Sequence, residues 1–258
     1  MKKILYLLLF IAGSITAQAQ DAEMADIMRS NGKIYVMGGI IDSTSGNATD
    51  TVLEFDPVAS SWATKSPMIF ASATHVAAGD GDMIVVFIQR SVATHAYSIS
   101  ANTWYSVTDA PNSYYGRGAA AVNGNYYLIG GQNLSSTGIW GNTNNFTGTT
   151  HELIIGALGS PDTWNPKADM PTGREYHSCA TVNGNIYAVG GYNNTNFDLR
   201  TVEMFNPTFN VWSKKYGMFS NRETASAVSL NGKLYVIGGM HMSNVVNTVE
   251  EYDPAVDP

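Results

Sequence analysis

The chain has 258 residues, of which 44% are hydrophobic, and a formal net charge of −7. This apolar content excludes a disordered chain, and an acidic balance without a basic stripe argues against nucleic acid and anionic membrane as partners. Cys179 is the single cysteine, which excludes an intrachain disulfide, so packing has to stabilise the fold.

Residues 1–19 have the pattern of a secretory signal peptide. Lys2 and Lys3 precede an apolar run from 4 to 13, and Ala17-Gln18-Ala19 provides small residues for cleavage. An apolar run of about ten residues is too short to cross a bilayer, which needs roughly twenty. We therefore expect cleavage near Ala19, no membrane span, and a secreted, periplasmic or cell-surface protein; an uncleaved N-terminal anchor is the alternative.

A short segment recurs along the rest of the chain. It begins with Asn-Gly, continues with an apolar stretch that contains Tyr, and ends with Gly-Gly. Its copies stand at residues 31–39, 123–131, 183–191 and 231–239. Because Asn-Gly favours the type I′ turn of a β-hairpin, each copy predicts two antiparallel strands joined at that turn.

A second marker follows the double glycine. An apolar strand ends in Asp-Pro or Asn-Pro, as at residues 52–57 and 202–207, and a Trp comes next. Proline cannot donate to a strand ladder, so it ends the strand. The Trp residues recur at intervals of roughly 40 to 60 residues, the range of propeller repeats. Each repeat is therefore predicted to hold four antiparallel strands, and the fourth carries Trp62, Trp104, Trp164 or Trp212.

The template divides the mature chain into five repeats. The second is degenerate, because Gly79-Asp80-Gly81-Asp82 replaces the turn and Phe87-Ile88 replaces the double glycine. The fifth lacks a Trp-bearing strand, which predicts an incomplete last sheet, either in a truncated gene product or in a ring that closes weakly. Self-association through that open edge is an expected consequence. The approximate bounds of the repeats are 25–68, 72–110, 117–170, 174–218 and 222–258.

Residue size indicates how the sheets are arranged. The first strands carry small residues, as at Ala119-Ala120-Ala121, the second strands are apolar at nearly every position, and the fourth strands carry Trp. Apolar residues on both faces indicate a sheet covered on both sides. Small residues near an axis and large ones at the rim are the taper of a radial propeller.

These marks resemble the kelch motif, in which a double glycine follows an apolar strand containing Tyr, and a spaced aromatic residue and a Trp come after it. The resemblance covers nearly all of residues 20–258. It implies an all-β kelch-type β-propeller of four-stranded antiparallel blades, about five in number, with the last one incomplete. Kelch propellers include oxidases, sugar mutarotases, substrate adaptors and structural proteins, so the fold does not fix an activity.

Strand parity predicts where a site would lie. The loops between second and third strands and the connections between repeats share one side, here named the loop face, while the Asn-Gly and Asp-Pro turns lie on the other. The resemblance implies that arginines before the first strand hold acidic peptide segments; pairing with a neighbouring Glu is the structural alternative. The candidate ligand-binding residues are Arg117, Arg174, Arg222, Tyr115, Tyr176, His177 and Trp140.

The sequence favours an exported binding scaffold that recognises an anionic peptide, protein or glycan. The alternative is an enzyme, a sugar mutarotase or epimerase acting on an acidic sugar such as sialic acid, with Glu175 or Glu223 as general base. A purely structural repeat is a third interpretation. No phosphate loop, nucleophile elbow or zinc signature is present, and the five histidines lack ligand spacing, so no metal or cofactor is expected.

Overall fold

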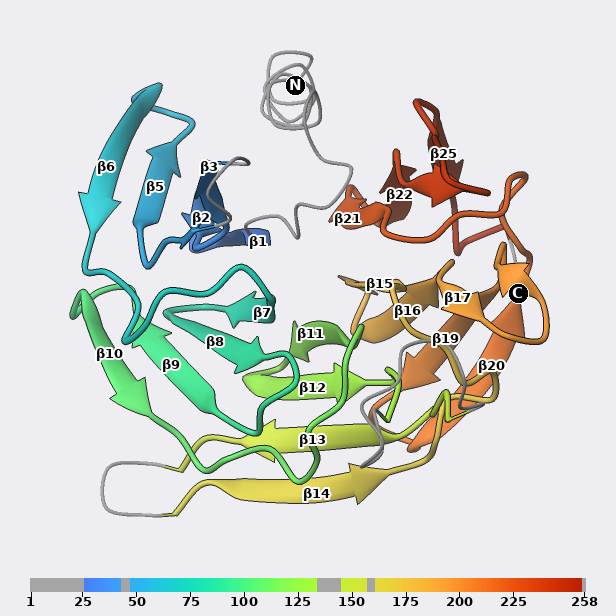
Figure 1. Ribbon diagram of the computed structural model, residues 1–258, viewed down its shortest axis with the longest axis horizontal. Coiled ribbons are helices and arrows are strands. Elements are labelled where there is room, and N and C mark those ends of the chain that lie inside the picture. The colour runs from blue at the N-terminus through green and yellow to red at the C-terminus, as the bar shows by residue number, and fades with distance from the viewer. Residues whose placement is uncertain (1–25, 43–46, 134–144, 157–160, 257–258) are drawn as a thin grey trace. The chain divides into compact units, whose positions relative to one another are not determined.

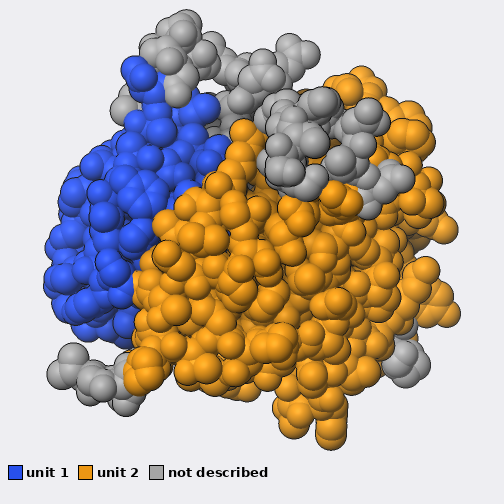
Figure 2. All heavy atoms as spheres, turned by 60° about the horizontal axis from the view of Figure 1, so that its bottom comes forward, with its two compact units in different colours: residues 1–88, 95–106 blue, residues 89–94, 107–258 orange. Residues whose placement is uncertain are grey.

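The computed structural model describes residues 26–42, 47–133, 145–156 and 161–256. Within these ranges every regular element is a β-strand, and no helix could cross a membrane. The strands belong to two compact units, shown in separate colours in Figure 2. Unit 1 comprises residues 1–88 and 95–106, and unit 2 comprises residues 89–94 and 107–258.

Unit 1 contains two antiparallel sheets of four strands, blade 1 and blade 2 (Figure 1). In each, the strands follow one another in space in the order of the sequence. A short hairpin, β3 (Ile40–Asp42) with β4 (Asn47–Ala48), extends the loop between β2 and β5. Blade 1 consists of β1 (Asp26–Ser30), β2 (Lys33–Met37), β5 (Val52–Asp56) and β6 (Ser61–Lys65), and blade 2 of β7 (His75–Asp80), β8 (Met83–Ile88), β9 (Thr94–Ser98) and β10 (Thr103–Ser106).

Unit 2 contains three sheets, blades 3 to 5, with two loop hairpins, β17 (Tyr192–Asn193) with β18 (Phe197–Asp198) and β23 (Met240–His241) with β24 (Asn244–Val245). Blade 3 consists of β11 (Gly118–Val122), β12 (Asn125–Ile129), β13 (Thr150–Ile154) and β14 (Thr163–Lys167). Blade 4 consists of β15 (Ser178–Val182), β16 (Asn185–Val189), β19 (Val202–Asn206) and β20 (Val211–Lys215). Blade 5 has three strands among the described residues: β21 (Ser226–Leu230), β22 (Lys233–Ile237) and β25 (Val249–Tyr252).

The repeated glycines perform two tasks, of which the sequence indicated the first, the hairpin turn. At the hairpin turn of blade 4, Asn183 has a φ of 49° and Gly184 a φ of 77°, the positive values that a type I′ turn requires. At the double glycine, the amide of Gly191 donates to the carbonyl of Arg222 in the next blade at 2.9 Å. A Cβ on Gly191 would lie 2.6 Å from the carbonyl oxygen of Glu175, so only glycine allows this approach.

The predicted order of residue sizes, with small residues in the inner strands and Trp in the outer ones, is confirmed inside unit 2. The small-residue strands β11, β15 and β21 lie next to one another, and the fourth strand of a blade is farthest from them in strand order. Trp212 of β20 packs against Tyr127 and Ile129 of blade 3, and its indole N–H donates to the carbonyl of Ala168 at 2.9 Å. The fold is an all-β, five-bladed propeller, as expected.

Candidate functional site

Two of the predicted arginines are buried ion-pair partners. Arg174, just before β15, is 0% exposed, and its Nη1 lies 2.7 Å from Oε2 of Glu203 in β19. Its Nη2 donates to the carbonyl of Ala188 in β16 at 3.1 Å. Arg222 repeats this arrangement with Glu250 in blade 5 and is also 0% exposed. Each arginine thus joins the second and third strands of its own blade, which agrees with the structural alternative of pairing with a Glu. Ligand binding by Arg174 and Arg222 stays a prediction.

Arg117 does not share their position in the repeat. The amide of Gly131 donates to the carbonyl of Arg174, whereas in the preceding blade the amide of Arg90 donates to the carbonyl of Tyr114. Tyr114 therefore occupies the arginine position in blade 3, and Arg117 stands three residues further along. The prediction that placed Arg117 with the other two arginines is wrong.

Arg117 is 6% exposed, and its Nη1 donates to the carbonyl of Asn112 at 2.9 Å. Its guanidinium carbon lies 4.8 Å from the centre of the Tyr114 ring. In β13, His151 takes the place that Glu203 and Glu250 hold in their blades. Burial without a nearby carboxylate lowers the pKa of Arg117 to about 10. This arginine is also shielded from a ligand.

His177 is buried as well. His177 is 5% exposed, and a Cβ on Gly130 would lie 2.7 Å from its Cε1. Burial, helped by the charge of Arg174, lowers the pKa of His177 to about 3, so the ring is neutral and fills space between blades. Trp140 lies outside the described residues.

The structure brings Tyr115, Glu175 and Glu223 together. Each stands directly before a residue with left-handed backbone: Gly116 at φ 64°, Tyr176 at φ 54° and Thr224 at φ 51°. Backbone hydrogen bonds link these three residues. The amide of Tyr176 donates to the carbonyl of Gly116 at 2.8 Å, and the amide of Thr224 donates to the carbonyl of Tyr176 at 2.9 Å. Tyr115, Glu175 and Glu223 thus occupy one register in three adjacent blades, and they are named the entrance row below.

The entrance row is fixed to the loop face by backbone pairs. Tyr115 exchanges hydrogen bonds with Gln132, Glu175 with Tyr192, and Glu223 with Met240, at distances between 2.7 and 3.0 Å. Each of these partners follows the double glycine of the same blade. The row therefore lies where the second strands end, on the side that strand parity predicted.

Aromatic rings and one exposed cation complete the surface beside Glu175. The guanidinium carbon of Arg90 lies 4.2 Å from the centre of the Tyr115 ring, and Tyr115 meets Tyr176 edge to face at 5.5 Å. Arg90 is exposed and has a φ of 59°. The sequence interpretation missed Arg90 because it placed Phe87-Ile88 at the double glycine of the degenerate repeat. That placement is wrong: Phe87 and Ile88 belong to β8, and Arg90 stands at the position of the second glycine.

The carboxyl groups of the entrance row are unusually weak acids. Glu175 is 6% exposed, and its Oε2 accepts no hydrogen bond from the described residues. Burial, together with the charge of Glu223, raises the pKa of Glu175 to about 7, although Arg90 opposes the shift. Burial, together with Asp198, raises the pKa of Glu223 to about 6. Both groups exchange protons close to neutral pH.

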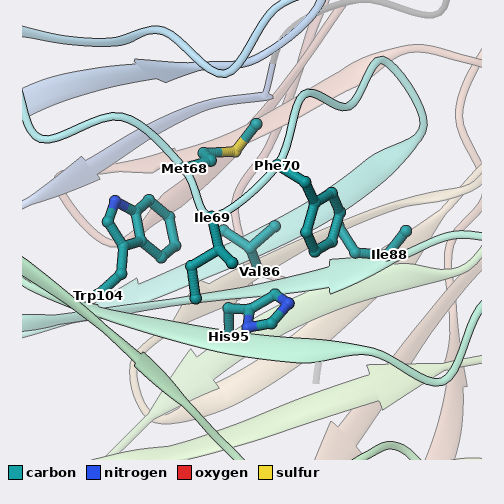
Figure 3. A pocket seen from close by; sticks show the side chains of 7 residues that line it. All are labelled: Met68, Ile69, Phe70, Val86, Ile88, His95 and Trp104. Atoms are coloured by element: carbon teal, nitrogen blue, oxygen red, sulfur yellow. The ribbon is translucent and has the colours of Figure 1, made fainter.

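The described part of the chain gives little support for a metal site, a reactive cysteine or a second ligand pocket in unit 1. No cluster of three His, Cys, Asp or Glu side chains there could hold a metal ion, and burial raises the pKa of the Cys179 thiol to about 12. Figure 3 shows an apolar cavity in unit 1 of about 10 Å³, close to the minimum for one water molecule. Its walls are Met68, Ile69, Phe70, Val86, Ile88, His95 and Trp104.

Comparison with protein families agrees with the repeats seen in the structure. A model described as Kelch motif matches residues 28–69, 173–215 and 222–257, which lie in blades 1, 4 and 5. A model described as CcmD family protein matches residues 4–41, and its C-terminal part overlaps the first kelch match within blade 1.

The curated relatives are kelch proteins of greater length. Kelch-like protein 30 of Homo sapiens is 31% identical over 43% of this chain and 17% of its own length. Kelch-like protein 36 of Rattus norvegicus is 25% identical over 69% of this chain and 29% of its own length. Beta-scruin of Limulus polyphemus is 29% identical over 46% of this chain and 12% of its own length. The chain thus spans less than a third of these relatives.

A solved structure titled "Structure of YjhT" matches with a TM-score of 0.69 and 16% identity, over 88% of this chain and 80% of that one. At this identity the match shows the fold alone. The antiparallel blades, the glycine that pairs with the next blade and the Trp that reaches the previous one agree with the sequence matches: the chain carries kelch motifs in blades 1, 4 and 5 and is similar to kelch-like proteins.

Proposed function

We propose that this chain is a protein-binding scaffold that holds an extended, basic segment of its partner against the entrance row. The kelch fold supports a binding role, since its repeated blades present loops from a rigid frame. The observation that carries the proposal is the entrance row itself, in which the pKa values of two carboxyl groups are raised and the Tyr115 and Tyr176 rings meet edge to face.

The charges near the entrance row indicate whether the bound segment is basic or acidic. The charge of Glu223 raises the pKa of Glu175 while Arg90 opposes that shift, and the charge of Asp198 raises the pKa of Glu223. Asp198 itself lies 2.9 Å from Nδ1 of His241. An anionic ligand, which the sequence favoured, would have depended on Arg117, Arg174 and Arg222, and all three are buried. A segment with Lys, Arg or backbone N–H groups meets the partly exposed carboxyl group of Glu223 instead, and the partly exposed ring of Tyr176 offers it apolar surface.

Two labelled peptides of equal length test this preference, one repeating Gly-Lys-Tyr and one repeating Gly-Glu-Tyr. We expect the basic peptide to bind more tightly in fluorescence anisotropy, and Glu223→Gln to weaken it at least fivefold. Asp109→Asn, which removes one negative charge at an exposed position elsewhere in unit 2, controls for net charge and should change little. Tighter binding of the acidic peptide would overturn the proposal.

The second candidate is a sugar mutarotase or epimerase. It is favoured by the pKa of Glu175, raised to about 7, because a general base works best with a pKa near the operating pH. An NMR measurement of anomer exchange in sialic acid tests it. A rate enhancement that Glu175→Gln abolishes would support the enzyme. Absence of any enhancement would favour the binding scaffold.

Export of the chain after cleavage near Ala19 remains a prediction of the sequence. Residues 1–25 lie outside the described ranges.

A further inference from the structure

Arg90 stands at a backbone position where the other blades have glycine. In blade 4 the amide of Gly191 donates to the carbonyl of Arg222, and the amide of Arg90 donates in the same way to the carbonyl of Tyr114 at 3.2 Å. Arg90 keeps a left-handed φ of 59°, which a residue with a Cβ adopts at a cost that glycine avoids. Local backbone preference therefore does not account for the arginine. The glycines at this position are Gly39, Gly131, Gly191 and Gly239.

The guanidinium of Arg90 lies over an aromatic ring of the entrance row. Its central carbon is 4.2 Å from the centre of the Tyr115 ring, a distance at which a cation is attracted to the ring face. Tyr176 meets the same ring edge to face. Tyr115 is 5% exposed, whereas Arg90 is an exposed residue. One face of Tyr115 is therefore covered by a side chain that is itself in contact with water.

A buried carboxyl group stands beside this pair. Glu175 lies against Gly116, the residue after Tyr115, because a Cβ on Gly116 would be 3.1 Å from Oε2 of Glu175. That oxygen is buried and accepts no hydrogen bond from the described residues. Burial and the charge of Glu223 raise the pKa of Glu175 to about 7, and the charge of Arg90 opposes this shift. A cation at the position of Arg90 thus meets a ring face and also acts on a carboxyl group.

We propose that Arg90 is an intramolecular competitor of the bound segment: a Lys or Arg of the partner displaces its guanidinium from Tyr115 and takes its place. This inference rests on the function proposed above and adds where the basic residue of the segment binds. The ring face attracts a cation whether it belongs to this chain or to a partner. Because two cations cannot occupy one ring face, Arg90 weakens the binding of the segment.

The surroundings of Arg90 allow such an exchange. An arginine has a long, flexible side chain, and one that is already exposed keeps its hydration when it leaves the ring. Cation–π contacts at exposed sites are weak enough for another cation to compete with them. An anionic ligand on Arg90 would instead approach the charges of Glu175 and Glu223, which repel it. The position therefore favours exchange of cations over capture of an anion.

Arg90→Gly is the direct test, because it gives blade 2 the residue that the other four blades have. We expect the basic peptide, which repeats Gly-Lys-Tyr, to bind this variant roughly threefold more tightly than the wild type in fluorescence anisotropy, the size of an exposed cation–π contact. Lys214→Ala is the matched control. It removes the same charge from an exposed position on β20, the outermost strand of blade 4, and should leave the affinity unchanged.

Tyr115→Leu tests whether the gain depends on the ring. Without this ring neither Arg90 nor the basic residue of the peptide has a face to occupy. Arg90→Gly should therefore give no gain in the Tyr115→Leu background, which is the non-additivity expected of residues in contact. Urea unfolding of each variant shows that the proteins compared are folded.

The NMR signals of Arg90 in the wild-type protein give a second readout that needs no variant. Protons held over a ring face have chemical shifts displaced by the ring current. The side-chain protons of Arg90 should move toward the shifts of a solvated arginine as the basic peptide saturates the protein. Binding elsewhere on the loop face would leave them in place.

The outcomes separate this inference from the function on which it rests. Displacement is overturned if the basic peptide binds the wild type and Arg90→Gly leaves its affinity unchanged or weakens it. It is also overturned if the Arg90 signals stay in place at saturation. In both cases the basic peptide still binds, so the proposed function stands. Binding to Arg90→Gly alone would support displacement, whereas binding to neither protein, or tighter binding of the acidic peptide, would overturn both proposals.

Discussion

Glu175 shows how a single buried group connects the binding face with stability. The residue is 6% exposed, and its Oε2 accepts no hydrogen bond from the described residues. The positive charge that opposes the shift, Arg90, lies over the ring of Tyr115. A carboxylate in such surroundings costs free energy to ionise. The residue therefore holds its proton to a higher pH in the folded chain than in the unfolded one.

This difference predicts how stability depends on pH. The pKa of Glu175 is raised from its ordinary value of 4.5 to about 7, so the folded state binds more protons between these values. The free energy of unfolding should fall as pH rises through this window. Glu175→Gln removes the titration, so the variant should gain stability relative to the wild type from pH 4.5 to pH 8. Urea unfolding across this range measures it, and a constant difference would contradict the assigned burial.

The Arg174–Glu203 pair supports a second prediction at this scale. Glu203→Gln leaves a buried guanidinium without its counter-charge and should reduce the free energy of unfolding by about 3 kcal/mol. The double variant Arg174→Met and Glu203→Leu removes both charges and should recover much of this loss. Urea denaturation of the three proteins gives the comparison. Equal losses in the single and double variants would show that packing, not charge, dominates the site.

The sequence predicted some residue roles and failed on others for an identifiable reason. Arg174 and Arg222 stand nine residues before the Asn of their hairpin turns, whereas Arg117 stands six residues before Asn123. Counting from the turn would have separated them. The ion pairs are harder to predict, because Glu203 belongs to a different strand from Arg174, and long-range register decides that contact.

At the scale of elements, the strands and turns followed from local rules. Asn-Gly turns, proline stops and spaced Trp residues each act through neighbouring residues, so they are visible in the sequence. The degenerate second repeat kept its sheet because β7 and β8 pair over their full length without a double glycine. Arg90, which stands in this repeat, lies over the ring of Tyr115 in the entrance row.

Trp62 and Trp212 provide a matched test of what a fourth strand contributes. Both occupy the same register, but Trp212 is 9% exposed and Trp62 is 46% exposed. Trp212→Ala should cost about 3 to 5 kcal/mol, as for a large buried side chain. Trp62→Ala should cost clearly less, because less apolar area is lost from the interior. Thermal or urea unfolding distinguishes them, and equal losses would contradict the packing described.

At the scale of the whole molecule, the entrance row lies within unit 2, where it comes from blades 3 to 5. Its carboxyl groups suit a basic segment, which agrees with the net charge of −7.

Within unit 1, the indole N–H of Trp104 donates to the backbone carbonyl of Ser66, which follows the fourth strand of blade 1, and within unit 2 that of Trp212 donates to the carbonyl of Ala168, which follows the fourth strand of blade 3. These two contacts between neighbouring blades have the same chemistry. Gain or loss of a complete repeat would preserve such a contact, whereas loss of a fourth strand would remove it. Kelch arrays should accordingly evolve in steps of entire modules, with shortening by single strands confined to their ends.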